Sequence, residues 1–192
     1  MKEFDFPEES EWEKLHREDE KEFIEKHLHL TDIKDIGDTP EGIRDKIDFE
    51  GLLNGKKVYV EVKLVKRKYP RICLEYMNSN LNVRPNETQP NKPGWMSSSK
   101  ADVLCYLFNE NGKTSGNAYD FKKLRRWYWL TRLQHKWEKS TSLNKTRRGE
   151  RYNTHCDLVP LTDIPNDIIL SEANLATFKP KRKLKKKKIA IA

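Results

Sequence analysis

Cysteine is scarce in this chain of 192 residues, and long apolar runs are missing. The three cysteines, Cys73, Cys105 and Cys156, lie far apart without a CxxC pair, which argues against a disulfide framework and a zinc ribbon. No stretch approaches the roughly 18 apolar residues of a membrane helix, and the first residues lack the apolar core of a signal peptide. We therefore expect a protein of a reducing cytoplasm without a membrane partner.

Basic residues are few at the start of the chain and abundant after it. Residues 1–50 hold 18 acidic and 8 basic side chains, a charge of −10, whereas residues 51–192 hold 12 acidic and 30 basic ones, a charge of +18. Such asymmetry favours a polyanionic partner, most often nucleic acid, with which the acidic head could compete. The end of the chain, KPKRKLKKKK, is similar to a nuclear localisation signal, so a nuclear location is the alternative in a eukaryotic host.

The order of patterns predicts an α/β or α+β fold with a mixed central β-sheet flanked by helices. We expect an acidic helical segment over 1–30 packed on a core over 31–178, and a flexible basic tail over 179–192. Within them we expect a helix over 8–30, loop over 30–46, a hairpin over 47–65, strands over 71–77, 103–108 and 156–164, a long loop over 78–94, a short helix at SSSKAD, a helix over 121–139 capped by Asp120, and a basic loop over 140–153.

The hairpin contains the first chemical signal. Asn54-Gly55 predicts a two-residue turn, so that residues facing each other have numbers that sum to 109. One face then pairs Phe49 with Val60 and is the core face, while the other pairs Asp48 with Glu61 and Lys46 with Lys63. Directly opposed like charges destabilise a sheet, so the pairing points to a role other than stability.

A divalent cation between the two carboxylates would remove this conflict, because Mg²⁺ often takes one or two carboxylates together with waters and a substrate phosphate. Lys63 lies on the same face and could orient water or stabilise charge on a phosphate. The alternative is a solvated strand face, the usual place of alternating charged residues.

Asp48, a gap of 12 residues and then EVK at Glu61 to Lys63 resemble the D…(D/E)xK signature of the PD-(D/E)xK, restriction-endonuclease-like nuclease superfamily. The acidic helix before the signature, the strand RICLEYM, the segment KPGWMSSSKADVLCYLF and the helix FKKLRRW are similar in order to phage and bacterial members. The resemblance covers about residues 12–165, and it implies a restriction-endonuclease-like core. The family's proline before the first aspartate is replaced by Ile47.

The resemblance implies a role for each matching residue. Asp48 and Glu61 would be metal ligands, the backbone carbonyl of Val62 would be a third, and Lys63 would be the catalytic lysine. The family often adds a glutamate from the first helix, for which Glu20 is our choice, with Asp19 and Glu22 close rivals. Glu75 could reach the metal, hold Lys63 in a second layer of contacts, or form a plain salt bridge.

Basic residues elsewhere are candidates for nucleic-acid binding. Lys100 would lie near a helix start, or be solvated beside a plain cap. The arginines of the helix over 121–139 are interleaved with aromatic residues, a pattern of phosphate and base contacts or of a core helix with basic edges. The full set is Lys100, Arg125, Arg126, Arg132, Arg147, Arg148, Lys185 and Lys186.

We therefore predict an Mg²⁺- or Mn²⁺-dependent deoxyribonuclease of structure-selective or weakly sequence-specific type, acting on DNA, with RNA not excluded and a homodimer as an option. The main alternative is a catalytically silent, nuclease-like protein that binds nucleic acid or a host protein.

Overall fold

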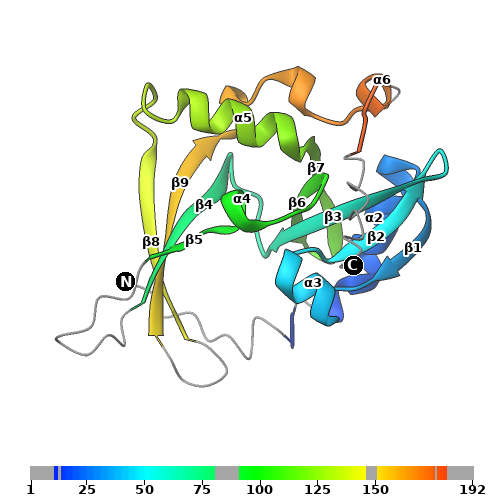
Figure 1. Ribbon diagram of the computed structural model, residues 1–192, viewed down its shortest axis with the longest axis horizontal. Helices are drawn as coiled ribbons and strands as arrows, with labels where there is room; N and C mark the ends of the chain where they lie inside the picture. The colour runs from blue at the N-terminus through cyan, green and yellow to red at the C-terminus, as the bar shows by residue number, and fades with distance from the viewer. Residues whose placement is uncertain (1–10, 13, 81–90, 146–150, 176, 181–192) are drawn as a thin grey trace, which may run out of the picture.

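The computed structural model describes residues 11–12, 14–80, 91–145, 151–175 and 177–180. It is an α+β protein built on two sheets and few helices. Figure 1 shows the sheets beside each other with α4 (Trp95–Ser98) between them. None of the helices in the described ranges is long and apolar enough to cross a membrane.

The first sheet is mixed and has five strands in the order β1-β2-β3-β6-β7. Strands β3 and β6 are parallel, and each other neighbouring pair is antiparallel. The bounds are β1 (Thr31–Asp35), β2 (Phe49–Leu53), β3 (Lys56–Val65), β6 (Val103–Glu110) and β7 (Lys113–Asp120). The mixed sheet of the prediction is therefore present.

The predicted hairpin register is confirmed. Phe49 pairs with Val60 and Leu53 with Lys56, so paired numbers sum to 109. Asn54 and Gly55 at the turn have φ values of 50° and 72°, the left-handed conformation that a type I′ turn requires and that Asn-Gly favours. This register places Asp48, just before β2, across from the Glu61 region of β3.

The second sheet is antiparallel and was not predicted as a separate sheet. Its order is β5-β4-β9-β8, formed by β4 (Arg71–Asn80), β5 (Lys92–Pro93), β8 (Glu138–Lys145) and β9 (Arg151–Pro160). Strands β4 and β5 belong to the long connection between the parallel strands β3 and β6, because parallel neighbours cannot be joined by a tight turn. Residues of this sheet lie next to the end of β3 and line a cavity together with it.

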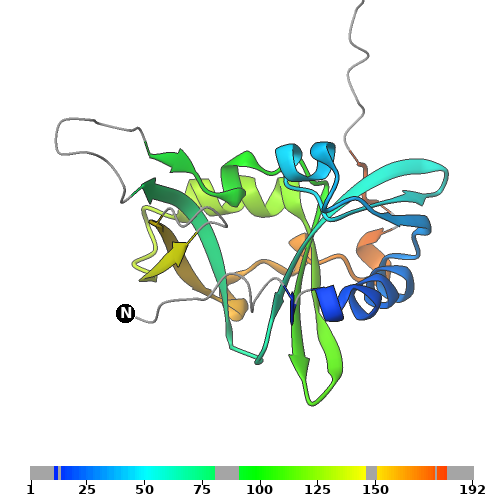
Figure 2. The same cartoon turned by 90° about the horizontal axis from the view of Figure 1, so that it is seen from below.

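Two apolar cores cover the two faces of the mixed sheet. On one face, α2 (Arg17–Leu28) and α6 (Glu172–Leu175) pack over Phe49, Val58 and Val60. On the other, α4, α5 (Phe121–Thr131) and residues of the antiparallel sheet pack around Leu104 and Tyr106. In Figure 2, α2 lies on one side of the mixed sheet and α5 on the other. Because both faces are covered, residues 103–109 are all buried.

Several expected boundaries are wrong. The segment 30–46, expected as loop, contains β1 and the six-residue α3 (Pro40–Asp45). The helix over 121–139 ends at Thr131, and the basic loop over 140–153 belongs largely to β8 and β9, with residues 146–150 outside the described ranges.

Three further predictions have mixed outcomes. The strand at 156–164 is part of the longer β9 and stops at Pro160, where η1 (Leu161–Asp163) begins, followed by η2 (Asn166–Ile168). The short helix begins before SSSKAD, at Trp95. The cap at Asp120 is confirmed, because its carboxylate accepts hydrogen bonds from the backbone N–H groups of Lys122 and Lys123, both at 3.1 Å.

Candidate functional site

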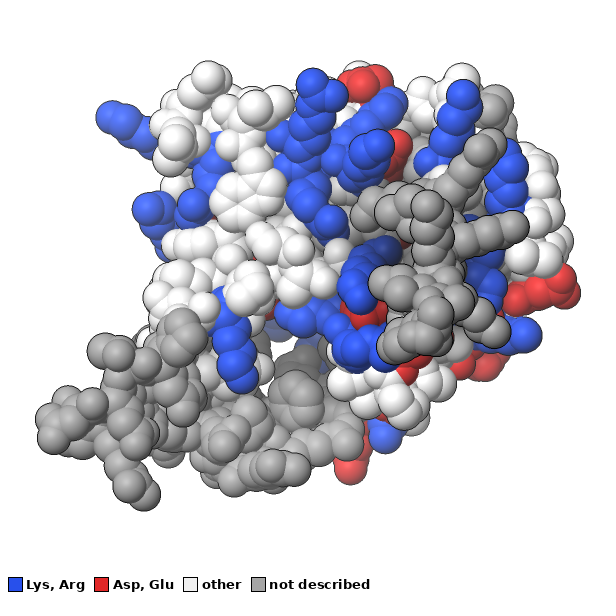
Figure 3. Space-filling view, in the orientation of Figure 1, with Lys and Arg blue, Asp and Glu red and all other residues white. Residues whose placement is uncertain are grey.

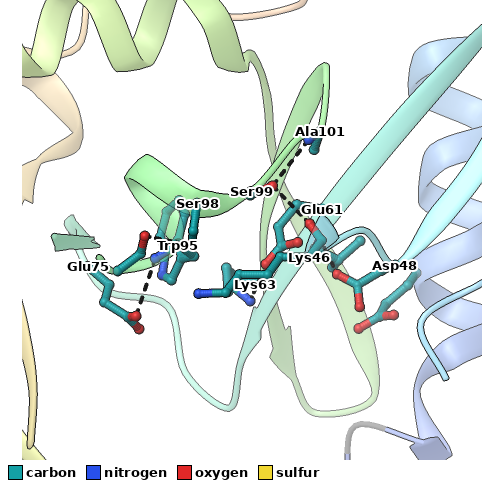
Figure 4. Close-up of polar contacts among 12 residues, drawn as sticks. Lys46, Asp48, Glu61, Lys63, Glu75, Trp95, Ser98, Ser99 and Ala101 are labelled. Atoms are coloured by element: carbon teal, nitrogen blue, oxygen red, sulfur yellow. Dashed lines mark hydrogen bonds and ion pairs between the residues drawn. The ribbon is translucent and has the colours of Figure 1, made fainter. Parts of the chain in front are cut away.

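A cavity of about 310 Å³ lies where the end of β3 meets the antiparallel sheet. Residues from both sheets and from the helices between them line it, as the close-up in Figure 4 shows for its charged members. The polar and aromatic lining residues are Lys46, Asp48, Glu61, Lys63, Glu75, Asn78, Trp95, Tyr152 and Thr154. The predicted trio Asp48, Glu61 and Lys63 thus faces one common space.

Asp48, just before β2, is held by hydrogen bonds of its backbone and of its side chain. Its N–H donates to the carbonyl of Val60 at 2.9 Å, which extends the hairpin by one residue. Its Oδ2 accepts a hydrogen bond of 2.7 Å from the N–H of Val62, and its Oδ1 accepts one of 3.1 Å from Arg17 Nη2. The carboxylate therefore has a defined orientation at the edge of the cavity.

Glu61 is a buried carboxylate with only 3% of its surface exposed. It lies on the face of β3 opposite Val60, and that face is covered by α4 and the antiparallel sheet. Burial raises the pKa of Glu61 to about 7; the Lys63 ammonium opposes this rise, and the charge of Asp48 adds to it. The solvated strand face that was the alternative interpretation is therefore wrong for Glu61.

Two lysines flank the carboxylates. Lys63 Nζ lies 2.6 Å from Glu61 Oε1 and 5.8 Å from the centre of the Trp95 ring. Lys46, from the end of α3, is half-buried in the same cavity, where burial lowers its pKa and the nearby Glu75 opposes that effect. With Glu75, the cavity thus combines three carboxylates and two ammonium groups around one space.

Glu75 reaches the cavity from the antiparallel sheet. Its Oε1 accepts hydrogen bonds from Asn78 Nδ2 at 2.7 Å and from the N–H of Trp95 at 3.3 Å. A Cβ on Gly94 would lie only 2.5 Å from the Glu75 carbonyl oxygen, so this approach of α4 to β4 requires a glycine. The structure thus places Glu75 at the cavity wall.

Glu20 is buried on α2, but it does not line the cavity. Arg17 lies between Glu20 and Asp48 and contacts both carboxylates. Its Nη1 donates to Glu20 Oε2 at 2.8 Å, while its Nη2 donates to Asp48. Burial alone would lower the pKa of Arg17, but the carboxylates of Asp48 and Glu20 raise it above its ordinary value. Glu20 is thus linked to the cavity through Arg17.

The predicted nucleic-acid contacts have different surroundings. Lys100 Nζ is paired with Asp45 Oδ1 at 2.6 Å and lies outside the cavity. Arg125 donates to the carbonyl of Ser99 at 2.9 Å, and Arg132 Nε lies 2.5 Å from the buried Asp157. Arg126 is exposed on α5. The remaining four, Arg147, Arg148, Lys185 and Lys186, lie outside the described residues.

The donor set suits a hard cation that keeps water ligands. Within the described ranges, no group of three or more His, Cys, Asp and Glu side chains could hold a metal. Burial and, to a lesser degree, the charge of Asp48 raise the pKa of Glu61, and a cation beside the two carboxylates would favour the ionised form of Glu61. Mg²⁺ and Mn²⁺ accept such oxygen ligands, whereas a structural zinc site requires more protein ligands.

Lys46, Trp95 and Arg17 were given no role by the sequence. The hairpin register did place Lys46 across from Lys63, but its position at the end of a short helix has no sequence signal, because glycine or asparagine is usual there. Arg17 lies in an acidic helix, and only the folded chain shows which of the many nearby carboxylates it contacts.

Comparison of the chain with protein-family models, curated proteins and solved structures finds no match.

Proposed function

We propose that this protein is a metal-dependent deoxyribonuclease with a restriction-endonuclease-like core. The observation that carries the proposal is the convergence of Asp48, Glu61 and Lys63 on one cavity. The arrangement of the fold supports it as well: a hairpin bearing the acidic residues, a parallel neighbour β6 behind it, and helices α2 and α5 on opposite faces of the mixed sheet.

Asp48 and Glu61 would hold Mg²⁺ or Mn²⁺, together with the carbonyl of Val62 if the family arrangement applies. The bound cation would supply Lewis acidity to a phosphoryl oxygen and lower the pKa of water. The water would give up one proton to solvent as its oxygen forms a bond to phosphorus, and the bond from phosphorus to one sugar oxygen would break. The leaving oxygen takes up a proton, so the products are a phosphomonoester and a free hydroxyl group.

Lys63 has a defined part in this scheme. Its ammonium lies at hydrogen-bond distance from Glu61 and faces the cavity, so it can donate to the phosphate oxygens as negative charge builds on them. The ammonium also lies over the Trp95 ring, 5.8 Å from its centre, in a cation–π contact. Lys63 is thus held between a ligand of the cation and the space for the substrate.

Surface charge supports a polyanionic substrate. On the face shown in Figure 3, Lys and Arg side chains are spread widely among few Asp and Glu side chains. Residues 51–192 have a charge of +18, which would attract a phosphate backbone without reading its sequence. DNA is preferred to RNA because the superfamily that the chain resembles acts mostly on DNA.

The test is cleavage of supercoiled, linear, single-stranded and branched DNA, and of RNA, with Mg²⁺, Mn²⁺ or EDTA. Lys63→Ala should lose at least about 100-fold in rate, since a preorganised donor to a charged transition state contributes that much. Lys56→Ala is the matched control, because Lys56 is exposed at the turn end of the same strand. Equal cutting by wild type and Lys63→Ala would contradict the proposal.

A second candidate is a silent nuclease-like protein that binds nucleic acid or a host protein. It is favoured by the protein partners of the carboxylates: Arg17 and the Val62 N–H for Asp48, and Lys63 for Glu61. These contacts balance part of the negative charge without a cation. This candidate predicts DNA or protein binding that survives EDTA, and no cleavage with either metal.

A further inference from the structure

Lys46 has a backbone conformation that is unusual for its residue type. It ends α3 with φ 52° and ψ 66°, in the left-handed region. Glycine, and sometimes asparagine, is common at this place after a helix, because a Cβ is disfavoured there. Residues held in disfavoured backbone conformations cluster at functional sites, so the side chain of Lys46 is a candidate for a function.

The backbone around Lys46 is held from two directions. The carbonyl of Lys46 accepts a hydrogen bond of 2.8 Å from Ser99 Oγ, and the next N–H, that of Ile47, donates to the carbonyl of Gly42 at 3.0 Å. Ser99 is itself buried. The start of the Lys46 side chain is therefore fixed, and the side chain extends into the cavity beside Lys63 (Figure 4).

The carboxylates nearest to Lys46 already have other partners. Glu61 is paired with Lys63 at 2.6 Å, and Glu75 accepts hydrogen bonds from Asn78 and the Trp95 N–H. For the part of the chain that the structure describes, Lys46 has no ion pair within 4.0 Å. Asp48 likewise has its partners in Arg17 and the Val62 N–H, so the half-buried Lys46 ammonium can contact an anion that enters the cavity.

We propose that Lys46 is a second cationic contact for a phosphodiester group of the substrate, acting from the side of the cavity opposite the antiparallel sheet. This inference rests on the proposed function for the identity of the substrate, but not for the presence of an anion site. Lys46 would bind a non-bridging phosphate oxygen, while Lys63 contacts the same group next to Glu61. As a group that touches the substrate, it would be a catalytic residue.

The test combines binding and kinetics in Lys46→Met, which removes the charge and keeps much of the length, and in Lys46→Gly, which also relieves the backbone. The control is Lys56→Met. Binding of the dinucleotide TpT and of inorganic phosphate is followed by NMR titration in EDTA, which needs no metal and no turnover. Cleavage of DNA with Mn²⁺ is measured separately as kcat and KM.

Both Lys46 variants should bind TpT about 10-fold more weakly, the usual effect of losing a hydrogen bond to a charged group. Their kcat/KM on DNA should fall by about 100-fold. Lys46→Gly should nevertheless melt at the wild-type temperature or above it, because glycine accepts the left-handed conformation without a Cβ. Loss of binding in a variant that folds at least as well separates this role from a structural one.

The outcomes separate this inference from the proposed function. If wild type does not cut but TpT binding is lost in both Lys46 variants and kept in Lys56→Met, the anion site stands and the nuclease proposal falls. If wild type cuts and the Lys46 variants bind TpT and cut like wild type, the inference about Lys46 is overturned and the nuclease proposal stands. If wild type neither binds TpT or phosphate nor cuts, both are overturned.

Discussion

The two sheets contribute different chemistry to the cavity that they share. From the mixed sheet come Asp48, Glu61 and Lys63, three charged groups on or beside strands that are covered on both faces. The antiparallel sheet contributes one carboxylate, Glu75, and neutral groups such as Asn78. Covered strands place charges where water is scarce, and this is why the pKa of Glu61 is raised.

The neutral groups of the antiparallel sheet form a chain of hydrogen bonds that ends at the cavity. Asn144 Nδ2 donates to Thr154 Oγ1 at 2.9 Å, Thr154 Oγ1 donates to Asn78 Oδ1 at 2.7 Å, and Asn78 Nδ2 donates to Glu75 Oε1 at 2.7 Å. This series of hydrogen bonds crosses the three strands β8, β9 and β4, and it fixes the orientation of the Glu75 carboxylate. For the proposed nuclease, we therefore expect the reacting groups to come from the mixed sheet and the antiparallel sheet to shape the space for the substrate.

The largest effect is expected from Glu61→Gln. The substitution keeps the shape of the side chain but removes the charge of the proposed metal ligand, so DNA cleavage should fall by about 1000-fold or more, as losses of single catalytic groups do. The matched control is Glu50→Gln, which removes a paired carboxylate of the same sheet outside the cavity. If Glu61→Gln cuts DNA at the wild-type rate, Glu61 takes no part in cleavage, and the mixed sheet does not supply the reacting groups.

The raised pKa of Glu61 predicts how stability depends on pH. In the folded protein this group keeps its proton up to about pH 7, whereas in the unfolded chain it loses it near its ordinary value of 4.5. The unfolded state therefore holds fewer protons between these values, and the free energy of unfolding should decrease as pH rises through this window, by up to about 3 kcal/mol.

Melting curves of wild type and Glu61→Gln in EDTA from pH 4.5 to 8 measure this dependence. Wild type should lose stability relative to the variant as pH rises, and cation binding should improve over the same range because it requires the ionised carboxylate. A stability difference that does not vary with pH would show that Glu61 is ionised throughout and that burial does not control its chemistry.

A third prediction concerns the attachment of the antiparallel sheet to α5. Asp157, on β9, is 2% exposed and accepts hydrogen bonds from Tyr128 Oη at 2.6 Å and from Arg132 Nε at 2.5 Å. Asp157→Ala leaves the arginine without its partner and should lower the free energy of unfolding by about 3 kcal/mol in chemical denaturation.

Cleavage measured well below the melting temperature should change little in Asp157→Ala, because Asp157 does not line the cavity. The control is Glu138→Gln, which breaks the exposed pair with Arg71 on the same sheet and should have an effect below about 1 kcal/mol. A large loss of cleavage in a fully folded Asp157→Ala variant would mean that the antiparallel sheet takes part in the reaction and does not merely line the cavity.

Local signals explain what the sequence could predict. The Asn54-Gly55 turn fixes the hairpin register, and the register alone places Asp48 near Glu61. Asp120 begins α5 through contacts within three residues. Each of these features depends on neighbours in the chain, so the pattern of residues contains the necessary information.

Features that depend on distant partners were missed. Leu133 continues the helical spacing of α5, yet it lies beyond the helix and is 92% exposed. The segment of β8 has no alternation of apolar residues, and its pairing with β9 decides its conformation. Likewise the sequence shows that Arg132 is basic, but only the fold shows that Asp157 already pairs with it.

The smallest effect, and the sharpest test of the division between the sheets, is expected from Thr154→Val. Valine has nearly the shape of threonine but cannot donate to Asn78, so Glu75 would lose part of its support. A neutral hydrogen bond contributes about 1 kcal/mol, so KM for DNA should rise about 5-fold while kcat stays within a factor of two. Thr141→Val is the control, because Thr141 is exposed on β8 and contacts His155 instead. A fall in kcat without a change in KM would place the Thr154 network in the reaction itself and end the distinction between the two sheets.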